Sequence, residues 1–194
     1  MRHWDVRMVG LVVRVAGLAG LLLVASCGAD ASVPQDATPP VVPVSPSASP
    51  APASPAEAAK AAAVAAYVGM WQAMARAGER SDWQSPELAR YATGDALTTI
   101  TRSLYADHFN GVVTRGAPSN SPVVMSAEPP QAPTTVLIED CGDSTNWLKY
   151  YEGTGTPAGD GAGGGRRSIT AEVTLQPDGS WRVSRFAVQG VGSC

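Results

Sequence analysis

Hydrophobic and polar residues follow two different periods along the chain. Between Glu57 and Asn110 the apolar side chains recur every three or four residues, which is typical of amphipathic helices. Ser54 and Glu57 have the spacing of a capping box, with a proline at the first helical position between them. Further helix starts are predicted at Ser85 and at Asp95, the expected cap of the last helix, so this half of the chain should form three helices.

From Val112 onward the period falls to two, which is typical of strands. The predicted short strands, separated by Pro and Gly, are Val112-Val113, Val123 to Met125, Thr134 to Ile138 and Trp147 to Tyr151. In the final hairpin, residues 169–175 alternate and Pro177-Asp178-Gly179 turns the chain into residues 181–184. The apolar phase slips just past Arg185, which indicates a bulge or bend. N-terminal helices packed on a strongly bent antiparallel sheet, an α+β domain, are therefore predicted over residues 57–194.

Residues 1–26 are typical of a lipoprotein signal peptide. Three arginines and one aspartate occupy residues 1–14, and the ten residues from Val15 to Val24 carry no charge. That length matches the apolar core of a signal peptide and is short of the about 20 residues of a transmembrane helix. Val24-Ala25-Ser26-Cys27 resembles the bacterial lipobox, with valine where leucine is usual, and the resemblance implies cleavage after Ser26 and acylation of Cys27. Ordinary secretion and a retained, uncleaved anchor remain the alternatives.

Residues 27–56 join the acylated cysteine to the domain. The segment from Ala31 to Ala56 contains eight of the sixteen prolines and no aromatic residue. Such a composition buries too little surface to offset the entropy of ordering, and it favours an extended, disordered tether of up to about 80 Å. The domain is thus expected at the extracytoplasmic face of the cell membrane, held there by lipid.

The charge balance restricts the possible partners. The formal net charge is −3, and removal of residues 1–26, with three arginines and one aspartate, would leave −5. A mildly acidic chain gives no support to nucleic-acid binding and no attraction to an anionic membrane surface. The lipid would therefore be the contact with the membrane.

Two cysteines remain when Cys27 is assigned to lipid. Outside the cytoplasm Cys141 and Cys194 are expected to form a disulfide. It would close a loop of about 54 residues and stabilise the fold by roughly 4 kcal/mol in the chain-entropy model. A redox or metal pair is the alternative, although the chain has no C-x-x-C spacing, and no metal or cofactor is predicted.

Three other features suggest chemistry at first. Asp107 and His108 are adjacent, but neighbours on a helix point about 100° apart, so a structural, partly buried histidine is predicted rather than a proton relay. The acidic residues around Cys141 lack the calcium-loop pattern, and a hydrogen-bonded turn with Asp143 and Ser144 as caps is predicted. The glycine-rich residues 153–165 lack the G-K-[ST] ending of a phosphate loop and are predicted to form a long hairpin loop.

The order of elements, the DGSWRV hairpin and the aromatic-rich first helix resemble the nuclear transport factor 2-like (cystatin-like cone) superfamily. More narrowly, the DCGDSTNW segment and the terminal cysteine resemble secreted and lipid-anchored actinobacterial proteins of unknown function. The resemblance implies helices that close the concave face of the sheet and often leave a pocket there. Candidate pocket-lining residues are Tyr67, Trp71, Tyr91 and Trp181, with ordinary core packing as the alternative.

Two functions are compatible with this sequence. The first is a non-catalytic binding or interaction module of the cell envelope, whose exposed sheet face carries a partner protein or a second copy of the chain. The second is a small-molecule-binding protein, or a lyase- or isomerase-like enzyme, with its site in the cone. Catalysis would require a carboxylate or histidine facing the pocket, and the sequence places none there. An open cavity of a few hundred Å³ would favour the second function, and a filled cone would favour the first.

Replacement of Cys27 by Ser tests the anchor. Because serine cannot be acylated in place of the thiol, C27S is expected to move from the membrane fraction to the soluble fraction. Fractionation followed by immunoblotting measures this distribution. Unchanged membrane association of C27S would contradict the lipoprotein assignment.

Overall fold

A computed structural model describes residues 54–159 and 164–194. The signal peptide, Cys27 and the predicted tether up to residue 53 lie outside the described residues. Within the described ranges, no helix combines the length and the apolar character that crossing a bilayer requires.

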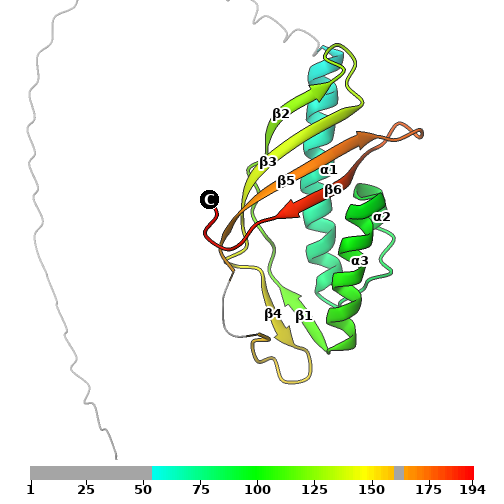
Figure 1. Ribbon diagram of the computed structural model, residues 1–194. Coiled ribbons are helices and arrows are strands. Elements are labelled where there is room, and N and C mark those ends of the chain that lie inside the picture. Colours follow the sequence, from blue (N-terminus) through cyan, green and yellow to red (C-terminus); the bar gives the residue numbers. More distant parts are fainter. Residues whose placement is uncertain (1–53, 160–163) are drawn as a thin grey trace, which may run out of the picture. The chain divides into compact units, whose positions relative to one another are not determined.

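Helices come first along the chain and strands follow, so the predicted α+β class is confirmed (Figure 1). In chain order the elements are α1 (Pro55–Gly78), α2 (Leu88–Tyr91), α3 (Gly94–Phe109), β1 (Val112–Arg115), β2 (Val123–Glu128), β3 (Thr135–Asp143), β4 (Leu148–Tyr151), β5 (Arg166–Leu175) and β6 (Trp181–Val188). Strands β2, β3, β5 and β6 form an antiparallel sheet in that spatial order, and β1 pairs with β4 in a separate two-stranded sheet.

Helix α1 begins where the sequence predicts. The Ser54 hydroxyl accepts a hydrogen bond from the Glu57 amide at 3.2 Å, which satisfies one of the free N–H groups of the first turn. The helix includes Pro55 at its first position, as the capping-box spacing predicts, so it begins two residues before the predicted domain boundary at Glu57. Most buried residues of α1 are alanine or glycine. A side chain at Gly69 would collide with the ring of Tyr91, so this glycine allows α2 to pack closely against α1.

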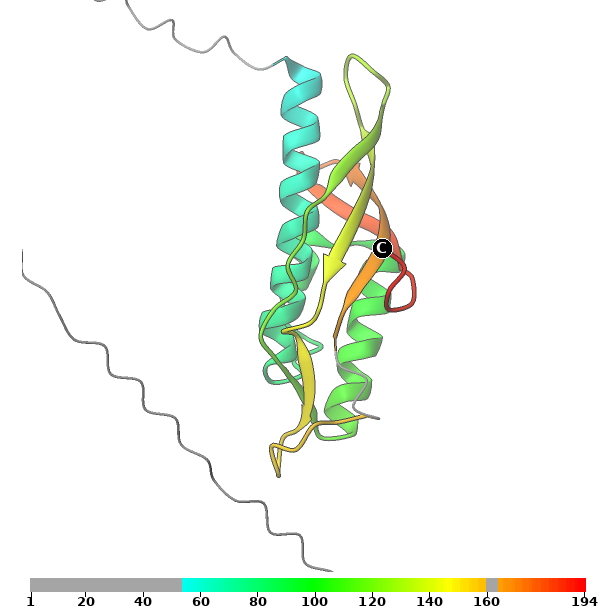
Figure 2. The ribbon, with the colours of Figure 1, turned by 90° about the vertical axis from the view of Figure 1, so that its left-hand side faces the viewer.

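The four-stranded sheet buries one face against the helices (Figure 2). Along β3 the residues alternate between buried and exposed, with Val136 and Ile138 inside and Leu137 outside. Ile169 and Val173 of β5 continue the buried surface. Together with apolar residues of α1 and α3, these side chains form the core.

The final hairpin carries the predicted turn and bulge. Asp178 accepts a hydrogen bond from the Ser180 amide at 3.0 Å, and Gly179 has a positive φ of 80°, as the turn requires. Glu172 pairs with Arg185 and Val173 with Val183, so one extra residue, Ser184, lies between them on β6. The bulge predicted beside Arg185 is confirmed, one residue earlier in the chain.

Three predictions of local structure are wrong. The acidic segment around Cys141 is a strand, because β3 continues through Asp143, and the predicted hydrogen-bonded turn begins only at its end. Residues 153–165 do not form one hairpin loop between β4 and β5, because β5 pairs with β3. Their described start folds back on β4 instead, where the Tyr151 amide donates to the Thr156 carbonyl at 2.8 Å. The N-cap of α3 is Thr93 instead of Asp95, whose charge lies in the first helical turn and stabilises it there.

Two neighbouring residues of β3 provide a test of this arrangement. I138A is expected to lower the free energy of unfolding by about 2–5 kcal/mol, because it leaves a cavity in the core. L137A, on the opposite face with 39% of the side chain exposed, should cost less than about 1 kcal/mol. Urea denaturation of both variants measures the difference. Equal losses would show that β3 does not have this register.

Candidate binding pocket

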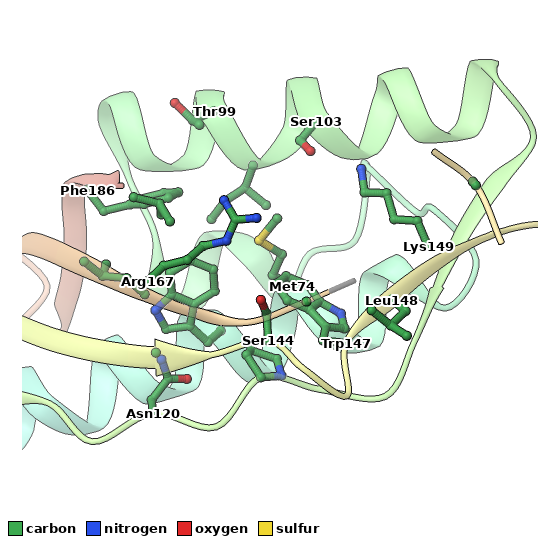
Figure 3. Close-up of a pocket in the computed structure, with 18 of the residues that line it drawn as sticks. Met74, Thr99, Ser103, Asn120, Ser144, Trp147, Leu148, Lys149, Arg167 and Phe186 are labelled. Atoms are coloured by element: carbon green, nitrogen blue, oxygen red, sulfur yellow. The ribbon is translucent and has the colours of Figure 1, made fainter. Parts of the chain in front are cut away.

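A half-open pocket of about 670 Å³ lies where the four-stranded sheet gives way to the β1–β4 pair (Figure 3). Helices α1 and α3, the β1–β2 connection and strands β3 to β6 all contribute to its wall. The apolar lining residues on these elements are Trp71, Met74, Ile100, Trp147, Leu148, Ile169, Phe186 and Val188. Volume and lining are in the range of sites that bind a small organic molecule.

Aromatic rings form one side of the pocket. Trp71 packs edge-to-face on Trp147 and Phe186, with ring centroids 6.1 and 5.5 Å apart. The indole Nε1 atoms of Trp71 and Trp147 are buried and have no hydrogen-bond partner among the described residues. Because these two nitrogens have almost no accessible surface, they are closed off from the cavity, and the indoles contribute apolar ring surface to its wall.

Two cations lie in the lining. Lys149 forms an ion pair with Asp107, whose two carboxylate oxygens lie 2.6 and 2.7 Å from its Nζ. The guanidinium of Arg167 reaches toward the middle of the pocket in Figure 3 and forms no ion pair with a described residue. The lining residues that the structure describes include no Asp, Glu or His, so their charged side chains are all cations.

The buried carboxylate of Asp140 links three segments behind the pocket wall. Asp140 accepts hydrogen bonds from the Tyr67 hydroxyl at 2.9 Å, the Asn120 side-chain amide at 2.6 Å and the Ser121 backbone amide at 2.7 Å. Burial, reinforced by the negative charge of Asp140, raises the pKa of Tyr67 well above its ordinary value. The Tyr67 hydroxyl therefore keeps its proton at neutral pH and donates it in the hydrogen bond to Asp140. The same carboxylate holds the side chain of Asn120 in the pocket lining.

The predicted disulfide between Cys141 and Cys194 is confirmed. It joins β3 to the end of the chain, which runs along the start of β5. There the Gln189 amide donates to the Ser168 carbonyl at 2.9 Å, and the Gly192 amide donates to the Arg166 carbonyl at 2.7 Å. The bonded tail thus supports the part of β5 that carries Arg167.

The four residues predicted to line a pocket lie in three different environments. Trp71 lines the pocket. Tyr91 and Trp181 line a separate, more open depression beside α1, and Tyr67 is fully buried in the core, where its hydroxyl bonds to Asp140. The structure therefore brings only Trp71 into the main cavity, and core packing, the alternative reading, applies to Tyr67.

The other candidate features have structural roles. His108 is exposed rather than partly buried, and its ring lies 4.6 Å from that of Trp83, while Asp107 bonds to Lys149. Asp143 caps the Thr145 amide at 2.8 Å, as predicted, but Ser144 bonds to the distant Gly165. In residues 54–159 and 164–194 no cluster of three His, Cys, Asp or Glu side chains could hold a metal ion.

Sequence reasoning missed Arg167, Trp147, Phe186 and the role of Asp140. A signal existed for Arg167, because it lies two residues before Ile169 and the alternation of β5 puts both on the inner face. For Asp140 no local signal existed, since its three donors lie 19, 20 and 73 residues away.

Alkaline titration tests the Tyr67–Asp140 hydrogen bond. In the unfolded chain Tyr67 should ionise near its ordinary pKa of 10.0, whereas in the fold it keeps its proton. The contribution of Tyr67 is therefore complete below pH 10 and is lost above it, by up to about 1.4 kcal/mol per pH unit. Y67F should be less stable than wild type by about 1.5–3 kcal/mol at pH 7, and the gap should narrow above pH 10.

Urea denaturation at pH 7 and pH 11 measures this gap. Y151F, which removes the hydroxyl of a ring that is 45% exposed, controls for general alkaline destabilisation. A gap between wild type and Y67F that stays constant with pH would contradict the proposed state of Tyr67.

No protein-family model matches the chain, and no curated protein matches it. Among solved structures, it is similar to the intermembrane space region of the chloroplast protein ARC6, with a TM-score of 0.47 and 15% identity over 72% of this chain and 99% of that chain. It is also similar to a ketosteroid isomerase-like protein from Erwinia carotovora atroseptica SCRI1043, with a TM-score of 0.41 and 12% identity over 66% of this chain and 92% of that chain. Both similarities are too distant to indicate a family or a function.

Proposed function

We propose that this chain is an extracytoplasmic lipoprotein whose domain binds an apolar small molecule without transforming it. The observation that carries the proposal is the open pocket of about 670 Å³ with Trp71, Trp147 and Phe186 in its wall. Exposed aromatic surface in a concave site is unfavourable in water, and an apolar ligand that covers it gains roughly 25 cal/mol per Å² buried.

The polar groups of the pocket support binding rather than acid–base catalysis. Proton transfer would need a titratable group facing the ligand. Among the described lining residues the charged side chains are Lys149 and Arg167, and Tyr150, whose ring packs against the guanidinium of Arg115, is the further titratable residue. Lys149 is engaged by Asp107, and arginine does not exchange its proton at ordinary pH. The hydroxyls of Ser103 and Ser144 have no neighbouring base in the lining that would activate them.

The lipid anchor and the superfamily assignment are part of the same proposal. The lipobox-like sequence ending at Cys27 supports attachment to the outer face of the cell membrane, and the proline-rich tether supports a domain held away from it. The succession of helices and the final β5–β6 hairpin support membership of the nuclear transport factor 2-like superfamily, among lipid-anchored proteins of actinobacterial type.

Exposed apolar residues favour a second candidate, a docking module of the cell envelope. Val123 and Leu137 lie on the outer face of the sheet with 60% and 39% of their surfaces exposed, and Met125 beside them is 52% exposed. A partner protein or a second copy of the chain could cover such a patch. The open pocket favours the first candidate.

Native mass spectrometry of the acylated chain, taken from its own envelope in mild detergent, tests the proposal. Wild type is expected to carry an extra mass that disappears on denaturation and that identifies the ligand. S103F, which puts a ring into the pocket from α3, should lose this mass, and R102F, on the neighbouring exposed position, should keep it. A bare wild-type monomer would contradict ligand binding, and a bare dimer would support the second candidate.

A further inference from the structure

The strand that carries Arg167 aims it into the pocket. Along β5, Ile169 and Val173 are buried on the inner face, and Arg167 occupies the same face two residues before Ile169. Arg167 and Ile169 both line the cavity. Figure 3 shows the guanidinium among the apolar side chains, between α3 and the strands.

This guanidinium has no balancing charge in the described part of the chain. Arg182 and Arg185, on the neighbouring strand β6, form ion pairs with Asp178 and Glu172, respectively. Arg167 has no such partner among the described residues. A half-buried cation beside aromatic rings is an unfavourable arrangement unless an anion or water completes it.

The described lining supplies no anion to Arg167. Its other polar groups are Lys149, the side-chain amide of Asn120 and the hydroxyls of Thr99, Ser103, Ser144 and Tyr150. A carboxylate accepts hydrogen bonds only, and it matches the planar fork of a guanidinium with two parallel bonds. The guanidinium therefore favours an anionic acceptor on the ligand, while the surrounding apolar wall favours a hydrophobic body.

We propose that the ligand of this pocket is an organic acid with an apolar body, whose carboxylate pairs with Arg167 while the body packs on Trp71, Trp147 and Phe186. The proposal rests on the function proposed above and adds the chemical class of the molecule. In this arrangement the anion removes the unpaired charge of Arg167 and the apolar body excludes water from the charge pair, which strengthens the pair.

A matched pair of probes separates the two proposals. We would measure binding of 1-naphthaleneacetate and of its neutral amide, 1-naphthaleneacetamide, by calorimetry and by tryptophan fluorescence. The protein is the full chain with C27S, purified without detergent, so that neither lipid nor detergent occupies the pocket. The C27S chain, with every pocket residue unchanged, should bind the acid at least about tenfold more tightly than the amide. A hydrogen bond from Arg167 to a charged carboxylate is stronger than one to a neutral amide by about this factor.

Substitution of Arg167 tests the source of this preference. R167Q should bring the affinity for the acid to within about twofold of that for the amide, and R167K should keep part of the preference. R185Q is the matched control, because Arg185 lies on the exposed part of β6 and pairs with Glu172. Its preference should equal that of wild type.

Each outcome decides between the proposals. Equal binding of acid and amide by the wild-type pocket, or a preference that persists in R167Q, would overturn the organic-acid proposal and leave small-molecule binding intact. If neither probe binds, both proposals fail. If R167Q does not fold, as judged by circular dichroism, the acid-to-amide ratio of the wild-type pocket and of R167K decides.

Discussion

The pocket depends on one buried carboxylate. Asp140 on β3 accepts hydrogen bonds from Tyr67 on α1 and from Asn120 and Ser121 in the β1–β2 connection. Two separate parts of the chain supply these donors, and a carboxyl group without them would be very unfavourable at 6% exposure. The helix, the sheet and the connection must therefore meet at this point, and their meeting sets the position of the pocket wall formed by Asn120 and Gly142.

The second constraint is the disulfide, which acts on the neighbouring strand β5. The chain-entropy model assigns about 4 kcal/mol to a covalent link across the 53-residue separation of Cys141 and Cys194. Its local effect matters more for the site, because the bonded tail supplies hydrogen bonds to the backbone of Arg166 and Ser168. Arg167 lies between these two residues, so the tail fixes the backbone from which its guanidinium reaches the pocket. An apparently structural disulfide is thereby coupled to the proposed binding residue.

The sequence predicted those features that depend on neighbours in the chain. The Ser54 cap, the turn at Asp178 and the alternation of β5 are local, and all are present. The extension of β3 was missed because Asp140 and Gly142 face the interior, where the period-two pattern requires apolar side chains. The pocket was only partly foreseen, since aromatic residues at helical spacing look alike whether they face a cavity, as Trp71 does, or the core, as Tyr67 does.

Close backbone contacts explain why a cavity persists in this domain. A side chain at Gly164 would overlap the carbonyl of Ser144, and one at Gly142 would collide with Ile169, so the strands around the pocket approach as closely as glycine permits. The residues behind the lining are thus tightly packed. A cavity left by poor packing would be expected to collapse or to be filled by side chains, whereas this one is bordered by closely packed strands. Around this wall, the rings of Trp71 and Trp147 and the guanidinium of Arg167 line the same space, and no described residue forms an ion pair with Arg167. Leucine side chains would satisfy apolar burial alone, so an arginine in this wall is the feature that the proposed acidic ligand explains.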